Sequence, residues 1–260
     1  MNFIAAAATD IGISKATNQD SIGVKIAETK YGKAALVVVC DGMGGLSKGE
    51  LASATVIRSL MNWFESDFPN ELDRWNWETI SNMIVERIQN LHLQILSYAK
   101  THNVKMGTTV TGMLIVRTHY MTFHVGDTRI YEITGEELHQ LTKDQTYFER
   151  DLKPLVETGK LTMEEAMQHP KHNALLQGVG ASKTVEPEIK YGNLKYDTNY
   201  MLCSDGFRHV LKEKELAGYL NPTVVYNKEM MQNRINKLIE VVKSRDEKDN
   251  ISVILIRAEI

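Results

Sequence analysis

Hydrophobic and polar positions follow two different periods along the first hundred residues. Residues 22–27 alternate strictly, and residues 34–40 form a continuous apolar run of the length of a buried strand. Apolar residues then recur every three or four positions, which predicts one helix from about residue 51, closed near Pro69, and a longer helix over residues 77–100. The spacing rests on Leu51, Ala54, Ile57, Met61 and Phe64 in the first helix and on Ile80, Ile84, Ile88, Leu91 and Ile95 in the second.

A period of two returns in the middle of the chain and predicts a set of successive strands. These strands cover residues 108–116, 120–125, 129–133 and 138–141, with short turn sequences between them. The polar stretch 147–180 predicts an insertion with short helices, and strands 185–191 and 200–203, a helix over 224–243 and a strand over 251–257 follow. The order is not a regular alternation of strand and helix, so we expect antiparallel sheets with helices on their outer faces.

Composition narrows the class of protein. The chain has 260 residues, five prolines, no Ser/Gly-rich linker and a net charge of -3, which favours one large domain and argues against a polybasic nucleic-acid surface. No apolar run has the length of a membrane span, and the first residues lack the basic region of a signal peptide, so we expect a cytoplasmic protein. Two cysteines, Cys40 and Cys203, are too few for a disulfide scaffold and are expected to be buried free thiols.

Five aspartates stand at the ends of predicted strands. Asp41 and Asp205 each follow an apolar run and precede a glycine, and Asp249 directly precedes the last strand. Asp20 opens an early strand, and Asp127 lies at a hairpin-like junction. Each aspartate by itself is as well explained as a turn residue or a helix cap. Five of them at strand ends predict one shared site, and without them the net charge of -3 becomes +2.

Clustered carboxylates require neutralisation because they repel one another. Their oxygen atoms favour Mg²⁺ or Mn²⁺ over zinc, and the eight histidines show no metal-ligand spacing. The glycine after Asp41 allows a backbone carbonyl, that of Gly42, to approach the same cation. Two such ions bind a phosphoryl oxygen and lower the pKa of a bridging water. The predicted reaction is therefore hydrolysis of a phosphate ester without a protein nucleophile.

Seven segments occur in an order that resembles the metal-dependent Ser/Thr protein phosphatases, the PP2C (PPM) family, of bacterial type. They span nearly the whole chain and are Lys15-Ala16-Thr17-Asn18-Gln19-Asp20-Ser21, Val39-Cys40-Asp41-Gly42-Met43-Gly44-Gly45, Met106-Gly107-Thr108-Thr109, Val125-Gly126-Asp127-Thr128-Arg129, Leu141-Thr142-Lys143-Asp144-Gln145, Leu202-Cys203-Ser204-Asp205-Gly206 and Lys248-Asp249-Asn250-Ile251-Ser252. The resemblance implies an α+β fold, a four-layer αββα sandwich in which two antiparallel sheets are flanked by helices. It also implies that residues 1–260 form one phosphatase domain and that 147–180 form a flap beside the site.

The resemblance implies two Mn²⁺ or Mg²⁺ ions per chain, with a weaker third. Asp41 would bridge the two ions, with the Gly42 carbonyl on one and both Asp205 and Asp249 on the other. Asp20 would contact the metals through water, and Asp127 would help to hold the third ion. Lys15 and the flap would bind the substrate.

Four positions depart from the family pattern. Lys15 replaces an arginine that grips the substrate phosphate, so we expect a looser grip with activity retained. Gln19 replaces a glutamate, which predicts weaker binding of the second ion. Met43 stands where animal-type members carry a histidine proposed as general acid, and Gln145 replaces another family histidine.

Several neighbouring residues are interpreted as structural. Asp144 is expected to cap the helix that opens the flap, and Arg129 to form a salt bridge or support strand pairing. The remaining interpretations are that Thr108 and Thr109 satisfy buried hydrogen bonds, that Asn250 orients the turn beneath Asp249, and that Trp63, Trp75 and Trp77 pack in or near the outer helices.

The function predicted from the resemblance is hydrolysis of phosphoserine and phosphothreonine on proteins, by a monomer, in opposition to a Ser/Thr kinase. The partners are phosphorylated proteins, with no nucleic acid and no membrane. The departures at Lys15 and Gln19 leave open a catalytically weakened regulatory or binding module. The ligand set also leaves open a metal phosphoesterase that acts on small phosphorylated metabolites.

Overall fold

Two antiparallel five-stranded sheets form the centre of the protein. The computed structural model describes residues 2–43, 48–72 and 76–259. The first sheet has the order β1-β10-β9-β6-β7 and the second the order β2-β3-β4-β5-β8. The strands are β1 (Asn2–Asp10), β2 (Ser21–Thr29), β3 (Gly32–Cys40), β4 (Val110–Val116), β5 (His119–Val125), β6 (Arg129–Thr134), β7 (Glu137–Gln140), β8 (Glu188–Asn193), β9 (Thr198–Cys203) and β10 (Ile251–Glu259).

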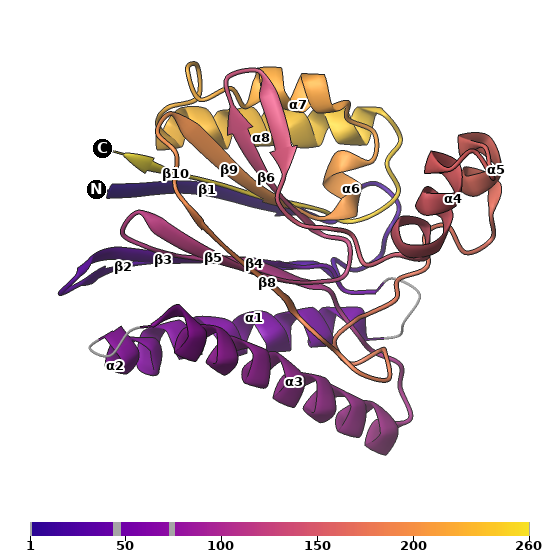
Figure 1. Ribbon diagram of the computed structural model, residues 1–260, viewed down its shortest axis with the longest axis horizontal. Helices are drawn as coiled ribbons and strands as arrows, with labels where there is room; N and C mark the ends of the chain where they lie inside the picture. The colour runs from indigo at the N-terminus through magenta and orange to yellow at the C-terminus, as the bar shows by residue number, and fades with distance from the viewer. Residues whose placement is uncertain (1, 44–47, 73–75, 260) are drawn as a thin grey trace.

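Helices cover the outer face of each sheet, so the molecule has four layers (Figure 1). One layer packs α1 (Gly49–Ser66) and α3 (Trp77–His102) against the second sheet, and the opposite layer packs α8 (Lys228–Ser244) against the first. The shorter helical segments are α2 (Phe68–Glu71), η2 (Phe148–Leu152), α4 (Lys153–Glu157), α5 (Met163–Gln168), α6 (Asp205–Arg208) and α7 (Glu213–Tyr219). This arrangement confirms the predicted αββα sandwich of the α+β class.

Burial of apolar side chains follows the layers. Inward-facing residues of both sheets, such as Val37, Met113 and Ile254, form a central core between the sheets. Alternate residues of the same strands, such as Val38 and Leu114, face the other way and pack under α1 and α3. Because successive side chains of a strand point to opposite faces, a sheet covered on both sides is apolar throughout, as the predicted run 34–40 is.

Several predicted boundaries need correction. The last helix begins at Lys228 and not at residue 224, because the side chain of Asn227 caps it by accepting the backbone N–H of Met230 at 2.9 Å. The strand predicted over 185–191 is observed as β8, three residues later, because Val185 packs into the helix-side core. The strand β1 and the helices α6 and α7 were not predicted individually, because short or alanine-rich segments carry a weak periodic signal.

The two cysteines confirm the prediction of buried free thiols. Cys40 packs in the core beneath α1 and α3, whereas Cys203 packs in the core beneath α8. Burial raises the pKa of Cys203 to about 12 and that of Cys40 well above its usual value, so neither forms a reactive thiolate near neutral pH.

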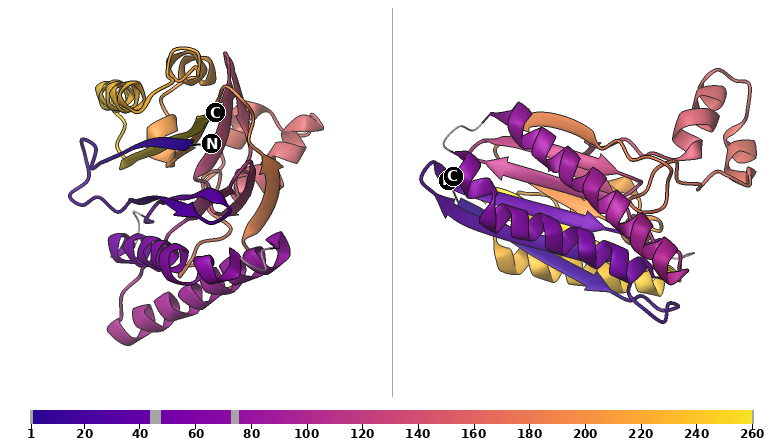
Figure 2. Two further views of the ribbon diagram at one scale, coloured as in Figure 1. Left: turned by 90° about the vertical axis from the view of Figure 1, so that its left-hand side faces the viewer. Right: turned by 90° about the horizontal axis from the view of Figure 1, so that it is seen from below.

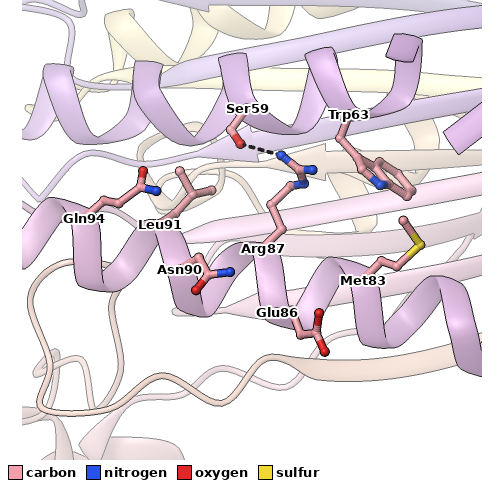
Figure 3. Close-up of a pocket in the computed structure, with 8 residues that line it drawn as sticks. All are labelled: Ser59, Trp63, Met83, Glu86, Arg87, Asn90, Leu91 and Gln94. Atoms are coloured by element: carbon pink, nitrogen blue, oxygen red, sulfur yellow. Dashed lines mark hydrogen bonds between the residues drawn. The ribbon is translucent and has the colours of Figure 1, made fainter. Parts of the chain in front are cut away.

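A hollow of about 290 Å³ separates α1 from α3 on the outer surface (Figure 3). Arg87 spans it, since its guanidinium donates to Ser59 at 3.2 Å and to Asp67 at 2.8 Å. Trp63 also lines the hollow, but its indole nitrogen is buried away from solvent and has no hydrogen-bond partner. Trp63 is therefore a packing residue, as predicted, and Trp77 packs near Tyr191; Trp75 lies outside the described residues.

Candidate metal centre

The five predicted aspartates are brought to one end of the sandwich by the strand registers. In the second sheet, Ser21 pairs with Cys40, so Asp20 before β2 lies beside Asp41 after β3. In the first sheet, Cys203 pairs with Val253, so Asp205 after β9 lies near Asp249 before β10. Asp127 lies on the connection between β5 and β6, which crosses from one sheet to the other. The sequence prediction that strand ends share a site agrees with this topology.

The backbone of Asp41 is held by the two residues that immediately precede strand β4, Thr108 and Thr109. Its N–H donates to Thr109 Oγ1 at 2.9 Å, and its carbonyl accepts both the Thr109 N–H and the Thr108 hydroxyl at 2.9 Å. Thr108 and Thr109 are almost completely buried, so the prediction that they satisfy buried hydrogen bonds near the site is confirmed.

The turn after Asp41 has no room for a side chain. A Cβ atom at Gly42 would lie 2.3 Å from the carbonyl oxygen of Gln19 and 2.7 Å from the backbone of Gly49. The Gly42 N–H donates to that same Gln19 carbonyl at 3.1 Å, which ties the Asp20 segment to the Asp41 turn. Glycine is required here because backbone approaches backbone. Gly44 and Gly45 of the same turn lie outside the described residues.

Asp20 reaches from the second sheet toward the first. Its carboxylate is 7% exposed and hydrogen-bonds Ser252 and Ser204, yet its Oδ2 atom has no partner. The pKa of Asp20 is raised to about 7, chiefly by burial and also by the charges of Asp205 and Asp249, while the hydrogen bonds of the two serines act in the opposite direction. A buried carboxylate oxygen without a hydrogen-bond partner in the protein is suited to bind a cation or a proton.

The loops that carry Asp205 and Asp249 pack against each other. A Cβ atom at Gly206 would lie 2.2 Å from the carbonyl oxygen of Asn250 and 3.1 Å from Cβ of Asp249, so only glycine permits this contact. Asn250 was predicted to orient the turn beneath Asp249, and it also holds a second segment of the protein. Its Oδ1 accepts the N–H of Gln19 at 2.9 Å and its Nδ2 donates to the carbonyl of Ile11 at 2.9 Å, so it fixes the segment that bears Lys15 and Asp20.

The carboxylates form a cluster of like charge. Burial raises the pKa of Asp41 well above its ordinary value, and Asp20 and Asp205 raise it further. The side chains of Asp41 and Asp205 are within hydrogen-bonding reach of each other. Burial likewise raises the pKa of Asp127 to about 7, with Asp205 adding to the shift and Arg208 opposing it. Such a cluster is stable only when protons or cations neutralise it.

The donor set fits hard divalent cations. The Asp205 Oδ1 atom, like Asp20 Oδ2, is buried without a hydrogen-bond partner. All the candidate ligand atoms are oxygens, which select Mg²⁺ or Mn²⁺. Over residues 2–43, 48–72 and 76–259, no group of three or more His, Cys, Asp or Glu side chains is spaced to hold an ion by itself. An ion here would therefore keep several water ligands, as Mg²⁺ usually does.

Lys15 lies at the edge of this cluster. Its Nζ atom is 2.9 Å from Asp249 Oδ1, and about a third of its side chain is exposed. Burial lowers the pKa of Lys15, but the hydrogen bond to Asp249 and the charges of Asp41 and Asp205 outweigh that effect and raise it. Lys15 is therefore a permanent positive charge beside the carboxylates.

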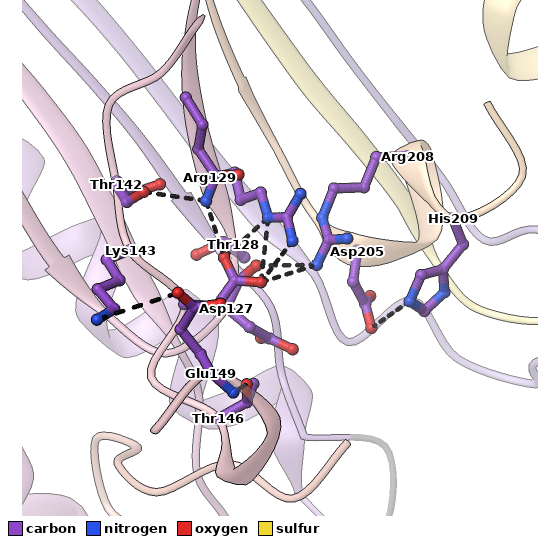
Figure 4. Close-up of polar contacts among 12 residues, drawn as sticks. Asp127, Thr128, Arg129, Thr142, Lys143, Thr146, Glu149, Asp205, Arg208 and His209 are labelled. Carbon is purple, nitrogen blue, oxygen red and sulfur yellow. Dashed lines mark hydrogen bonds and ion pairs between the residues drawn. The ribbon is translucent and has the colours of Figure 1, made fainter. Parts of the chain in front are cut away.

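A salt-bridge network flanks Asp127 (Figure 4). Arg129 donates to both carboxylate oxygens of Asp144 at 2.6 to 3.1 Å, and Arg208 lies 3.7 Å from the same carboxylate. Arg208 also donates to the backbone carbonyl of Asp127 at 3.3 Å. The predicted salt bridge of Arg129 is confirmed. The prediction that Asp144 caps a helix is wrong, because Thr146 accepts the N–H of Glu149 at the start of η2.

Two residues near the site were missed at the sequence level. His209 lies 3.8 Å from Asp205 and 3.7 Å from Glu247, and Figure 4 shows its ring directed at the Asp205 carboxylate. Glu247 accepts the backbone N–H groups of Lys248 and Asp249 at 2.8 and 3.0 Å and so shapes the loop that presents Asp249. The spacing of four between Asp205 and His209 was a usable signal, because such residues share a helix face.

The predicted flap segment, residues 147–180, carries η2, α4 and α5, and its two short helices project beyond the sandwich (Figures 1 and 2). At its base, the Gln145 carbonyl accepts the N–H of Leu176 at 2.8 Å. The sulfur of Met43 is oriented toward this segment, since a Cβ atom at Gly178 would meet its methyl group. Met43 therefore supplies apolar contact and no proton at this position.

The comparisons with known proteins place the chain in a family. The model of the protein phosphatase 2C family matches residues 13–243. A putative protein phosphatase 2C-type of Streptococcus pyogenes is 30% identical over 253 residues, which covers 96% of each chain. The chain belongs to the protein phosphatase 2C family, and the predicted family and class of enzyme are confirmed.

Solved structures agree with this assignment. The serine/threonine phosphatase of S. agalactiae superposes with a TM-score of 0.82 at 30% identity, covering 99% of this chain and 100% of that one. The catalytic domain of the serine/threonine protein phosphatase PstP, solved in complex with two manganese ions, gives a TM-score of 0.75 at 25% identity, with 98% and 97% coverage. Among the helices of the described residues, none combines the length and apolar character needed to cross a bilayer.

Proposed function

We propose that this chain is a Ser/Thr protein phosphatase that hydrolyses phosphoserine and phosphothreonine on proteins and so opposes a Ser/Thr kinase. The observation that carries the proposal is the pair of buried carboxylate oxygens without partners, one on Asp20 and one on Asp205, within a cluster of like charge. Membership of the protein phosphatase 2C family and similarity to the two streptococcal proteins support the substrate class.

The proposed ligand roles follow the predicted set, within one phosphatase domain over residues 1–260. Asp41 would be shared by two Mn²⁺ or Mg²⁺ ions, and the Gly42 carbonyl would serve one ion and Asp205 and Asp249 the other. Asp20 would act through water, and Asp127, whose backbone carbonyl accepts a hydrogen bond from Arg208, would help to hold a weaker third ion. The two manganese ions of the PstP structure support the count of two.

The metal ions and the protein would contribute different parts of the chemistry. Divalent ions, when bound, supply Lewis acidity and a water of lowered pKa for attack on phosphorus. Thr108 and Thr109 fix the backbone of Asp41, and Glu247 orders the loop that presents Asp249. Lys15 holds the substrate phosphate as a point charge at the edge of the cluster, and the flap segment borders the substrate.

The test is an assay with a phosphothreonine peptide and with p-nitrophenyl phosphate, with and without Mn²⁺, on the wild type and Asp205→Asn. We expect Mn²⁺-dependent hydrolysis that Asp205→Asn removes. Asp246→Asn is the matched control, because Asp246 is 84% exposed and has a left-handed backbone that asparagine tolerates. Hydrolysis without a divalent metal, or full activity in Asp205→Asn, would contradict the proposal.

The same assay separates the other candidate functions. Binding of Mn²⁺ and phosphopeptide without turnover would identify a catalytically weakened regulatory module, which the departures at Lys15 and Gln19 favour. Turnover of small phosphate monoesters but not of phosphopeptides would identify a phosphoesterase for metabolites.

The role of Lys15 gives a separate prediction. Lys15→Ala is expected to raise KM for the phosphopeptide by roughly 10-fold, the equivalent of about 1.4 kcal/mol for one charge contact near a surface. Lys15→Arg is expected to keep or lower KM, because its planar fork binds phosphate through two hydrogen bonds. Lys214→Ala, on an exposed helix away from the site, is the control. Unchanged kcat and KM in Lys15→Ala would show that Lys15 does not grip the phosphate.

A further inference from the structure

His124 is a buried histidine in β5 to which the proposed reaction assigns no role. Its side chain is 1% exposed; its Nε2 atom lies 3.1 Å from the Lys143 carbonyl oxygen and its Nδ1 atom 2.7 Å from Thr111 Oγ1. A carbonyl oxygen only accepts hydrogen bonds, so Nε2 carries the hydrogen. Burial lowers the pKa of His124 to about 4, so the ring is neutral near pH 7 and Nδ1 is an acceptor. Thr111 must therefore donate its hydroxyl hydrogen to His124.

The chain of hydrogen bonds continues from Thr111 toward Asp41. Thr111 Oγ1 lies 2.5 Å from Thr128 Oγ1, and the Thr111 oxygen is the acceptor there because its hydrogen is committed to His124. Thr128 is also the donor toward Thr109 Oγ1 at 3.3 Å, so its one hydroxyl hydrogen is shared between Thr111 and the more distant Thr109, and Thr109 Oγ1 accepts the backbone N–H of Asp41 at 2.9 Å. Thr109, Thr111 and Thr128 are each at most 1% exposed, so water does not compete with these bonds.

The other end of this series of hydrogen bonds, at His124, lies at the base of the flap segment. Lys143 and Gln145 immediately precede that segment. Gln145 donates its backbone N–H to the Gly126 carbonyl at 2.7 Å and its side-chain amide to the His124 carbonyl at 3.3 Å. Gly126 in turn donates to Gln145 Oε1 at 3.0 Å. The base of the flap segment is thus joined to His124 by both side-chain and backbone hydrogen bonds.

We propose that Thr111 and His124 are positioning residues of the metal centre, which hold the base of the flap segment and the Asp41 backbone in one fixed register. The proposal rests on the proposed function, because it assigns these residues to the same metal site. Neither residue touches a candidate metal ligand, so their effect is transmitted through Thr128 and Thr109. Outer hydrogen bonds of this kind orient ligands and commonly affect metal affinity and activity.

The chain offers a matched control on the same strand face. Thr122 precedes His124 by two positions, so both side chains point to the same side of β5. Thr122 is 2% exposed and makes no side-chain hydrogen bond that the described residues show. Thr122→Val and Thr111→Val are the same chemical change at two buried positions. Only Thr111→Val removes a hydroxyl group from the series of hydrogen bonds.

The experiment measures the Mn²⁺ dissociation constant by titration calorimetry, and kcat and KM for a phosphopeptide, well below the melting temperature of every variant. Thr111→Val is expected to weaken Mn²⁺ binding roughly 10-fold and to lower kcat, the scale typical of outer hydrogen-bond partners. Thr111→Ser is expected to restore both values because it keeps the hydroxyl. Thr122→Val is expected to match the wild type.

The outcomes are distinguishable. Equal Mn²⁺ affinity and kcat in Thr111→Val and Thr122→Val would overturn the positioning role. If Thr111→Val does not fold, Thr128→Val removes the next hydroxyl group in the series. Wild-type Mn²⁺ affinity and kcat in Thr128→Val would likewise overturn the positioning role. A wild-type protein that binds no Mn²⁺ would instead overturn the proposed metal centre, on which the role depends.

Discussion

Asp41→Asn should abolish phosphatase activity, with a loss of roughly 1000-fold or more, the equivalent of about 4 kcal/mol of transition-state stabilisation. Asp41 is the carboxylate assigned to both ions, and asparagine brings neither the charge nor the second carboxylate oxygen. The measurement is kcat/KM for a phosphothreonine peptide at saturating Mn²⁺. Substantial activity at high Mn²⁺ would contradict the shared-ligand role.

The same substitution should have the opposite effect on the stability of the metal-free protein. Burial and the charges of Asp20, Asp205 and Asp127 disfavour the ionised form of Asp41, so a neutral amide at this position avoids that cost. We expect Asp41→Asn to melt at a higher temperature than the wild type in a chelator but to gain less from added Mn²⁺. Asp246→Asn, on the surface, should change neither value. A lower melting temperature in the chelator would show that Asp41 is not held against like charges.

The metal-free wild type should lose stability as pH rises from 5 to 7.5. Burial is the main cause that raises the pKa of both Asp20 and Asp127 to about 7 from the ordinary value of 3.8. The folded state therefore binds more protons than the unfolded state in this window, and the free energy of unfolding falls with rising pH. His124 acts in the opposite direction, because its pKa is about 4 in the folded state and 6.5 ordinarily, and it offsets about one carboxyl. The net loss should be on the order of a few kcal/mol.

Bound Mn²⁺ should remove this dependence, because the ions bind deprotonated carboxylates. Melting temperatures at pH 5, 6.5 and 7.5, with Mn²⁺ and with a chelator, provide the measurement. Asp20→Asn should flatten the slope in the chelator, whereas Asp246→Asn should not. A metal-free protein that becomes more stable toward pH 7.5 would contradict the buried cluster of protonated carboxyls.

Much of the fold could be predicted because the periodic signal is strong in long elements. The helix predicted over 77–100 is observed as α3, and the buried run 34–40 lies within β3. Short helices such as α6 and α7 carry less than two turns of pattern and were missed. Strand character was predicted for the first 40 residues, but β1 was not delimited, because its alanines carry little periodic signal and its bounds are set by pairing with β10 along its whole length.

The sequence predicted which residues are candidate ligands, but it did not predict which residues form hydrogen bonds or salt bridges around them. Asp-Gly pairs after apolar runs identified Asp41 and Asp205, because a carboxylate at a strand end followed by glycine is a local feature. The serines that hydrogen-bond Asp20 come from residues 204 and 252, more than 180 positions away. The partners of Asp144 could not be predicted locally, because Arg129 in β6 and Arg208 in α6 are brought to it by the tertiary fold.

The amino-acid sequence by itself determined which segments form strands and helices, which aspartates stand at strand ends, and the family. Local side-chain periodicity and residue type suffice for these features. Only the tertiary structure decided which carboxylate oxygens are buried without a hydrogen-bond partner, that Lys15 pairs with Asp249, and that a buried line of hydroxyl groups joins His124 to Asp41. Those features depend on registers between strands far apart in the chain and on the low polarity of the interior, which no local pattern contains.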